Sequence, residues 1–256
     1  MSIQQQSPIA NRQSEIYIDG SHGEGGGQVL RTSLSLSLIT GRPFRMDKIR
    51  AGRSKPGLQP QHLACVRAAA AMSSATVEGD ALGSQTLTFA PGPVRPGDYT
   101  FNVVEERGSA GAATLVLQTV LLPMTFQVPR FQVMQNTEHA SRLTILGGTH
   151  VPWSPCYHYV EQVYLPTLAQ LGIQALSNIT RWGFFPVGGG QIGVTVSPTD
   201  ARHQRIGTDE TSVGVHHPLE ELAAPGRLLR ISGISAVANL PLFRGPHQGI
   251  GMLAAA

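Results

Sequence analysis

A glycine-rich stretch near the start of the chain holds residues whose types and spacing could do chemistry. DGSHGEGGGQVLRTS, residues 19–33, contains five glycines, the carboxylate of Glu24 and the cation of Arg31. Glycines let backbone N–H groups close around an anion because they have no Cβ atom. No Walker-type Lys-Ser/Thr pair follows them, and Gln28 stands where a dinucleotide fingerprint needs its third glycine. The first hypothesis is therefore a glycine loop of a third kind that binds an anion.

A basic segment follows in RPFRMDKIRAGRSK, residues 42–55, where six cations accompany a single acid. If this segment is a strand, Lys48 and Arg50 share one face, because side chains alternate along a strand. Arg53 and Lys55 would then continue the basic surface beyond a glycine. Since arginine binds phosphate through a planar fork, the segment predicts a track for phosphates. A solvated charged face is the more frequent explanation of such a run, and it stays open.

Individual polar positions near these stretches each have two interpretations. Glu24 is expected to be exposed at a strand-to-helix turn, where it either satisfies a helix dipole or positions a metal or a hydroxyl. Arg31 is either a surface cation or a phosphate ligand. Gln118 lies in an apolar helix and is predicted to be buried, so it needs a hydrogen-bond partner in the protein or on a ligand's base edge. The nine histidines show no zinc-protease spacing.

Composition places the chain among globular proteins. It has 256 residues, 41% hydrophobic and 14% charged, which is enough to bury a large core. The two cysteines, Cys65 and Cys156, form no disulfide framework or metal pattern, so a reducing cytoplasm is expected. Residues 1–15 lack the apolar core of a signal peptide and are predicted to be a disordered tail. The apolar run at 114–126 is too short to span a membrane.

The elements that must position these residues follow one repeated order. Residues 16–97 predict strand EIYIDG, helix GQVLRTSLSLSLITG, strand PFRMDKIRA, helix QPQHLACVRAAAAMSS and strands ATVEG and SQTLTFAPG. Residues 98–198 predict strand DYTFNVV, helix SAGAATLVLQTVLLPMTF, strand RLTILGGT, helix YHYVEQVYLPTLAQLGI and strands QALSNITRWGFF and GGGQIGVTVSP. Both halves therefore read β-α-β-α-β-β, an α/β (α+β) fold made of repeated units. Residues 199–256 are weakly patterned, and RLLRISGISAVANLP is expected to start a further unit.

Several motifs together resemble the RNA 3'-terminal phosphate cyclases. These motifs are DGSHGEGGGQVLRTSLSLSLITGRPF, IRAGRSKPGLQPQHLACVRAAA, LVLQTVLLP, GGTHVPWSP and WGFFPVGGGQI. The resemblance runs from about Ile16 to Pro198 and resumes weakly at ISGISAVANLP. It implies βαβαββ units like the C-terminal domain of initiation factor 3, with a smaller inserted α/β domain. Residues 199–256 would be the start of that inserted domain.

The resemblance also implies a reaction, a pair of cofactors and a set of site residues. Members of this family use ATP and a divalent metal, Mg or Mn. A histidine takes up AMP, AMP passes to the RNA 3'-phosphate, and the 2'-hydroxyl expels it to leave a 2',3'-cyclic phosphate. Carried over by motif, the catalytic residues are Glu24, Arg31, Arg50, Arg53 and His62. The residues that bind the nucleotide are Gln118, Pro152 and Pro155. The expected partners are ATP and RNA 3'-phosphate ends, with neither membrane nor DNA.

The sequence departs from the family pattern in two places. The family's nucleophilic histidine motif has no match here, and His247 does not fit it, so a chain truncated at its C-terminus is expected. Cys156 and His158 stand where proline and aspartate are more usual. One alternative is a non-catalytic relative that binds RNA in ribosome assembly. Another is an enolpyruvyl transferase, which has a related repeat fold and also binds phosphate through arginine.

Overall fold

The computed structural model describes residues 15–103, 111–126, 141–196 and Ile234. All of them except Ile234 belong to one compact unit, residues 1–216, to which the following description refers. The predicted tail, apart from Glu15, and all but one residue of the predicted segment 199–256 lie outside the described residues. Within the described part of the chain, no helix has both the length and the apolar character that a membrane crossing requires.

Two four-stranded sheets have the same internal arrangement. The first has the strand order β1-β2-β4-β3, and the second has the order β5-β6-β8-β7. In each, the first two strands are parallel and are joined through a helix, while the remaining pairs are antiparallel. The first half contains β1 (Ile16–Asp19), α1 (Gly27–Thr40), β2 (Phe44–Asp47), α2 (Pro60–Ser73), β3 (Thr76–Glu78) and β4 (Leu87–Ala90).

The second half repeats this order with one irregular helix. It contains β5 (Asp98–Asn102), α3 (Ala113–Thr125), β6 (Ser141–Gly147), α4 (Tyr157–Tyr159), a π-helical segment (Val160–Tyr164), α5 (Leu165–Gln170), β7 (Ala175–Arg181) and β8 (Gly190–Val196). Pro166 follows the π-helical segment, at the start of α5, and the N–H of Leu165 donates to the carbonyl of Val160, five residues earlier. Both halves thus follow the predicted β-α-β-α-β-β order, and the mixed α/β class is confirmed. Their likeness to initiation factor 3 stays a prediction.

Hydrophobic spacing explains why the first helix forms where it does. Leu30, Leu34 and Leu38 recur every four residues, and all are buried. The helix ends at Gly41, whose left-handed φ of 69° lets its N–H donate back to the carbonyl of Ser37. The alternating LSLSL pattern, which is also compatible with a strand, is therefore part of a helix, as expected.

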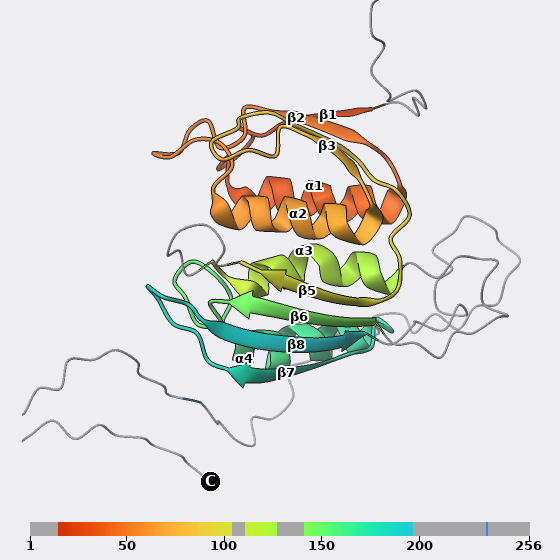
Figure 1. Cartoon of the computed structure of the whole chain (residues 1–256), viewed down its shortest axis with the longest axis vertical. Helices are drawn as coiled ribbons and strands as arrows, with labels where there is room; N and C mark the ends of the chain where they lie inside the picture. The colour runs from red at the N-terminus through yellow and green to blue at the C-terminus, as the bar shows by residue number, and fades with distance from the viewer. Residues whose placement is uncertain (1–14, 104–110, 127–140, 197–233, 235–256) are drawn as a thin grey trace, which may run out of the picture. The chain divides into compact units, whose positions relative to one another are not determined.

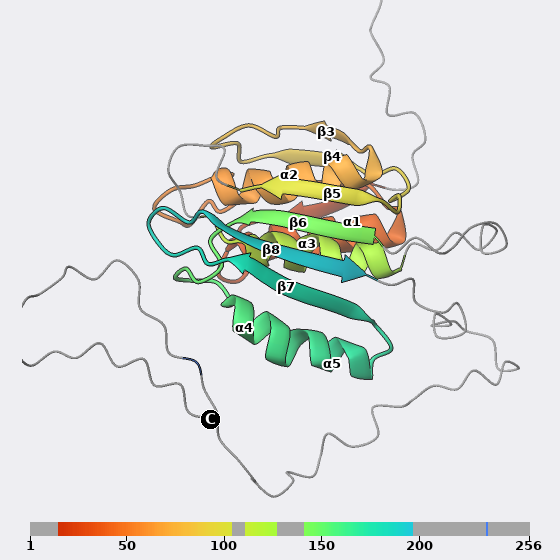
Figure 2. The same ribbon diagram turned by 60° about the horizontal axis from the view of Figure 1, so that its bottom comes forward.

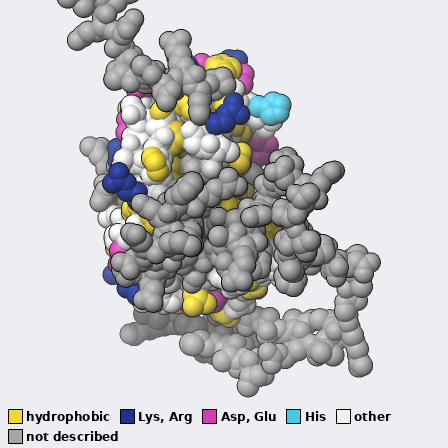
Figure 3. All heavy atoms as spheres, turned by 90° about the vertical axis from the view of Figure 1, so that its right-hand side faces the viewer, with side chains coloured by type: hydrophobic (Ala, Val, Ile, Leu, Met, Phe, Trp, Pro, Cys, Tyr) yellow, Lys and Arg dark blue, Asp and Glu magenta, His cyan; other side chains and the backbone are white. Residues whose placement is uncertain are grey.

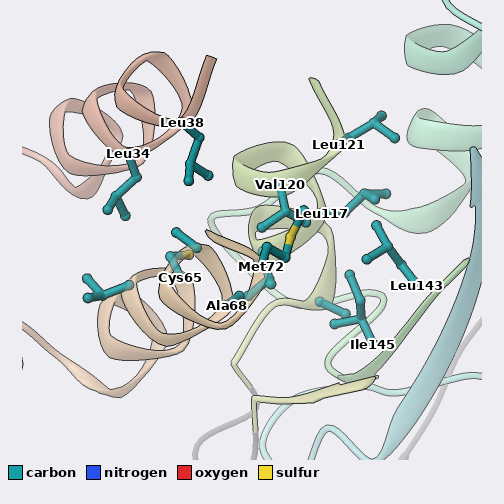
Figure 4. Packing of buried hydrophobic residues seen from close by; sticks show 14 of the residues in the cluster. Leu34, Leu38, Cys65, Ala68, Met72, Leu117, Val120, Leu121, Leu143 and Ile145 are labelled. Carbon is teal, nitrogen blue, oxygen red and sulfur yellow. The ribbon is translucent and has the colours of Figure 1, made fainter. Parts of the chain in front are cut away.

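The three long helices pack against one another between the two sheets and share one core (Figure 4). Two side-chain contacts show how they align. The hydroxyl of Ser35 on α1 donates to the carbonyl of Thr119 on α3, at 2.8 Å. The thiol of Cys65 on α2 lies 3.9 Å from the carbonyl of Leu115, one turn earlier on α3. The middle of α1 therefore meets the middle of α3, and the first half of α2 meets the first turn of α3, as expected for helices that run in the same direction.

This alignment brings the helix N-termini to one end of the unit. The loops after β1, β2 and β6 and the β7–β8 hairpin lie at that end, on the left in Figure 1 and again in the turned view of Figure 2. We call it the loop end. Figure 3 shows the opposite end, where the Lys and Arg side chains of described residues lie in separate small groups.

Two sequence predictions are wrong in their local detail. The strand predicted in the basic segment stops at Asp47, and Lys48 and Arg50 have left-handed φ values of 54° and 53°. They therefore do not share a strand face. Gln118 is exposed rather than buried, because it lies on the side of α3 that neither the other helices nor the second sheet covers.

Candidate functional site

The glycine loop between β1 and α1 is tied down at its start by Asp19. This carboxylate accepts hydrogen bonds from the backbone N–H of Ser21 at 2.9 Å and from its hydroxyl at 2.6 Å. Lys48 reaches the same carboxylate, at 3.0 Å. The hydrogen bonds from Ser21, followed by that from Lys48, hold the pKa of Asp19 well below its usual value. Asp19 therefore acts as an ionised anchor for both loops, a role that the sequence did not indicate.

The loop backbone itself requires glycine. Gly23 and Gly25 have φ values of 62° and 55°, in the left-handed region that other residues avoid. Gly26 is the N-cap of α1, where no described side chain caps the helix, and the first turn of α1 carries no acid. The first N–H groups of α1 are thus left for another acceptor, and the helix dipole favours a negative one.

The side chains of His62 and Arg31 pack closely against Gly27, the first residue of α1. A Cβ atom built on Gly27 would lie 2.2 Å from Nε2 of His62 and 2.9 Å from Nη1 of Arg31. The N–H of Gln59 donates to Nδ1 of His62 at 3.1 Å, so the imidazole proton is on Nε2. Burial, together with the charges of Arg50 and Arg31, lowers the pKa of His62 to about 3. The ring is therefore neutral at physiological pH and presents an N–H donor to the loop.

Arg31 is a partly buried cation that has no counter-charge among the described residues. Its Nε is buried and has no hydrogen-bond partner, and burial lowers its pKa. The ion pairs of the described residues join Arg45 to Asp47, Lys48 to Asp19 and Arg53 to Glu24, so none involves Arg31. An uncompensated buried charge is strongly unfavourable. Its retention beside an uncapped helix N-terminus indicates a place for an anion.

Arg50 and Arg53 complete the positive charge around the loop. Arg50 donates to the carbonyls of Lys55 and Gly57, at 2.7 and 3.1 Å, and so holds its own loop closed. Burial, then the nearby charge of Arg53, lowers the pKa of Arg50. Arg53 lies 3.4 Å from the carboxylate of Glu24, whose side chain is 94% exposed.

The structure thus brings together the catalytic set carried over from the family motifs. It consists of Glu24, Arg31, Arg50, Arg53 and His62, and we call it the cationic cluster. The expected exposure of Glu24 is confirmed, whereas the side chain of Arg31 is partly buried, with a fully buried Nε, rather than a freely exposed surface cation.

The residues predicted to bind a nucleotide lie on other elements of the loop end. The carbonyl of Pro155 accepts a hydrogen bond from the hydroxyl of Thr114, at 2.8 Å, in the first turn of α3. Gln118 lies one turn further along the same helix face, and its side chain is exposed. Pro152, also exposed, is in the same loop as Pro155. Among the described residues, no hydrogen bond or ion pair joins these three residues to the cationic cluster, although both groups occupy the loop end.

Sequence reasoning missed the aromatic residues that surround this second group. His150, His158, Trp182 and Phe184 come into contact through the pairing of the loop after β6 with the β7–β8 hairpin. The departure from the family pattern at His158 was the one signal available. The other contacts depend on strand pairing that the sequence does not reveal.

Comparison with known proteins gives a consistent set of similarities. Residues 22–235 match the family model for RNA 3'-terminal phosphate cyclase. Proteins named RNA 3'-terminal phosphate cyclase are 50% identical in Nostoc punctiforme over 229 residues and 47% identical in Gloeothece citriformis over 227 residues. One from Methylococcus capsulatus is 46% identical over 231 residues. Each alignment covers 88% of this chain but 57–59% of the relative, so the chain spans less than two thirds of their length.

Proposed function

Because the chain belongs to the RNA 3'-terminal phosphate cyclase family, we propose that its cationic cluster binds the 3'-terminal phosphate of an RNA for ATP-dependent cyclisation to a 2',3'-cyclic phosphate. One observation carries this proposal: the partly buried guanidinium of Arg31, whose buried Nε has no partner among the described residues, lies beside the uncapped N-terminus of α1. A phosphate bound there would supply the missing negative charge and accept from backbone N–H groups as well.

Each member of the cationic cluster has a role that its surroundings support. Arg31 and Arg53 are the phosphate-binding cations, and Arg50 mainly holds the loop that carries Arg53. Neutral His62 donates a hydrogen bond from its Nε2–H group to a phosphate oxygen. It does so through Nε2 because Nδ1 already accepts a hydrogen bond from the N–H of Gln59. Glu24 is exposed and weakly paired, so it is free to turn toward a metal ion or a ribose hydroxyl.

ATP and a divalent metal are proposed as cofactors. In this chemistry ATP supplies the AMP group whose departure makes ring closure by the 2'-hydroxyl favourable. The cationic cluster fits polyphosphate, and the exposed amide of Gln118 beside the Pro155 loop is available for the rest of a nucleotide. The described residues contain no group of three metal-binding side chains. Glu24 with substrate phosphates fits magnesium, which commonly uses one or two carboxylates and keeps its waters.

The proposal assigns binding and presentation of the phosphate to these 256 residues. They contain no match to the family's nucleophilic histidine motif, so the whole reaction is proposed for the family architecture rather than for the described residues alone. Both Cys65 and Cys156 are free thiols, which agrees with a reducing cytoplasm as the proposed location.

Binding of a labelled oligoribonucleotide tests the proposal. The 3'-phosphorylated strand should bind more tightly than the same strand with a 3'-hydroxyl, and Arg53→Ala should remove most of this difference. Arg45→Ala is the matched control, because Arg45 forms an exposed ion pair on β2. Equal affinity for the two strands would contradict the proposal. Measurable ATP affinity separates it from the non-catalytic alternative, which has no use for an ATP site.

A further inference from the structure

A cluster of aromatic side chains at the loop end lies outside the cationic cluster. The rings of His150 and Trp182 are stacked, with centroids 4.6 Å apart and planes 8° from parallel. The ring of Phe184 lies 5.3 Å from that of His150 and 5.9 Å from that of Trp182. The ring of His158 lies 4.9 Å from that of Trp182. We call these four residues the aromatic cluster.

The backbone beneath the aromatic cluster is rigidly held. Thr149 is fully buried, and its hydroxyl oxygen accepts from the N–H of Gly183 at 2.9 Å. The N–H groups of Thr149 and His150 both donate to the carbonyl of Gly183, at 2.9 Å. A Cβ atom at Gly183 would lie 2.4 Å from the nitrogen of Gly190, so only glycine fits. The loop after β6 and the β7–β8 hairpin are thereby fixed against each other.

A chain of short polar contacts links the buried threonine to the two imidazole rings. The Thr149 hydroxyl oxygen lies 2.8 Å from Nδ1 of His150 and 3.4 Å from the carbonyl oxygen of Gly183. Nε2 of His150 in turn lies 2.9 Å from Nδ1 of His158. These contacts fix the orientation of both rings, and among the described residues no hydrogen bond involves Nε2 of His158. The cluster therefore presents one oriented ring nitrogen.

The cluster is open to solvent. Trp182 is 39% exposed, and Arg181 beside it is exposed as well. A cluster that served only to hold the hairpin would gain most from burying its largest ring. Here a stacked indole and an oriented ring nitrogen of His158 lie at the same end as the cationic cluster, and the exposed Arg181 directly precedes the tryptophan in the chain.

We infer that the aromatic cluster binds an unstacked nucleobase of the RNA whose 3'-phosphate occupies the cationic cluster. The inference rests on the proposed function and adds a second contact with the same substrate. Single-stranded nucleic acids are held by a positively charged surface together with aromatic rings on which bases stack. In this arrangement Trp182 provides the ring face, Nε2 of His158 forms a hydrogen bond with the base edge, and the adjacent Arg181 adds an exposed positive charge.

Fluorescence provides the test, because the chain contains two tryptophans, Trp153 and Trp182. Trp153→Phe leaves Trp182 as the reporter and is the parent for the comparison. Its emission should be quenched when the 3'-phosphorylated oligoribonucleotide binds. Adding Trp182→Leu should weaken binding about tenfold, the usual effect of losing one base stack. The preference for a 3'-phosphate over a 3'-hydroxyl should persist, because it depends on Arg53.

The outcomes separate this inference from the proposed function. A parent without any 3'-phosphate preference would contradict the proposed function. A parent that keeps the preference but shows neither quenching nor weaker binding after Trp182→Leu would overturn the inference alone. A loss of ATP affinity without a loss of RNA affinity would also overturn it, since the base bound would then be adenine of ATP. If the Trp182→Leu variant does not fold, two other measurements test the inference. Quenching of Trp182 emission in the parent and retained RNA affinity in Trp182→Phe would support it, and the absence of quenching would overturn it.

Discussion

His62 lies so close to Gly27 that a Cβ atom on the glycine would stand 2.2 Å from its Nε2. The first residue of α1 therefore touches the first turn of α2, and the glycine loop cannot move without disturbing the imidazole. The absence of a side chain at Gly27 also leaves Arg31 room to approach the helix N-terminus.

Replacing Gly27 with alanine should damage both stability and binding. The added methyl group must displace His62 or Arg31, and overpacking of this kind costs about 1–3 kcal/mol of unfolding free energy. Urea unfolding and 3'-phosphate binding measure the two effects. Gly52→Ala is the control, because a Cβ atom there meets nothing within 4 Å. A Gly27→Ala variant as stable as the Gly52→Ala variant would show that the loop rearranges freely.

Arg31→Met should weaken phosphate binding without destabilising the free protein. The substitution removes a partly buried cation whose Nε has no described partner and keeps much of its apolar stem, so the free energy of unfolding should stay constant or rise by about 1 kcal/mol. Thermal unfolding of the phosphate-free protein measures the effect on stability. Titration with the 3'-phosphorylated oligoribonucleotide measures the effect on phosphate binding. A clear fall in stability would mean that Arg31 has a structural partner outside the described residues.

His62 should make the protein sensitive to acid. Its folded-state pKa is lowered to about 3, below the unfolded value near 6.5, so the unfolded state takes up a proton first as pH falls. This contribution to stability is present above the unfolded pKa and is lost toward the folded one, by roughly 2 kcal/mol between about pH 7.5 and about pH 5. Urea unfolding of His62→Asn should show a shallower pH dependence than the wild type. His22→Asn, in the exposed loop, is the control; equal slopes for all three proteins would refute this role.

Glu24→Gln should separate metal binding from phosphate binding. The exposed pair with Arg53 contributes little to stability, so unfolding should change by less than about 0.5 kcal/mol. Without metal, the variant should bind the 3'-phosphorylated strand more tightly, because Arg53 no longer shares its charge with a carboxylate. Added Mg²⁺ should strengthen wild-type binding but not that of the variant. Identical Mg²⁺ responses would remove Glu24 from the proposed metal site.

Sequence patterns predicted the elements well because each depends on local periodicity. Leu30, Leu34 and Leu38 mark one helix face wherever that helix packs. The prediction that Gln118 is buried was wrong because α3 is apolar on nearly every side. The local sequence does not indicate which side of α3 the neighbouring helices leave uncovered. The prediction that Arg50 lies on a strand was wrong because the flanking sequence is typical of a strand, whereas the backbone of Arg50 is left-handed. This conformation is uncommon for residues other than glycine.

The site was predictable only in part. The approach of Arg31 and His62 to one loop came from the family resemblance, since residues this far apart in sequence show no common pattern. The unpaired state of Arg31 and the tautomer of His62 depend on three-dimensional packing.

The shared core of the three helices has a consequence for how the protein unfolds. Contacts such as Ser35 with Thr119 and Cys65 with Leu115 cross between the two repeats, and buried residues of both form one cluster. Neither repeat can lose its structure without exposing the apolar face of the other. The boundary near residue 97 therefore marks a repeat in architecture but not an autonomous folding unit, and we expect the two halves to unfold in a single cooperative transition.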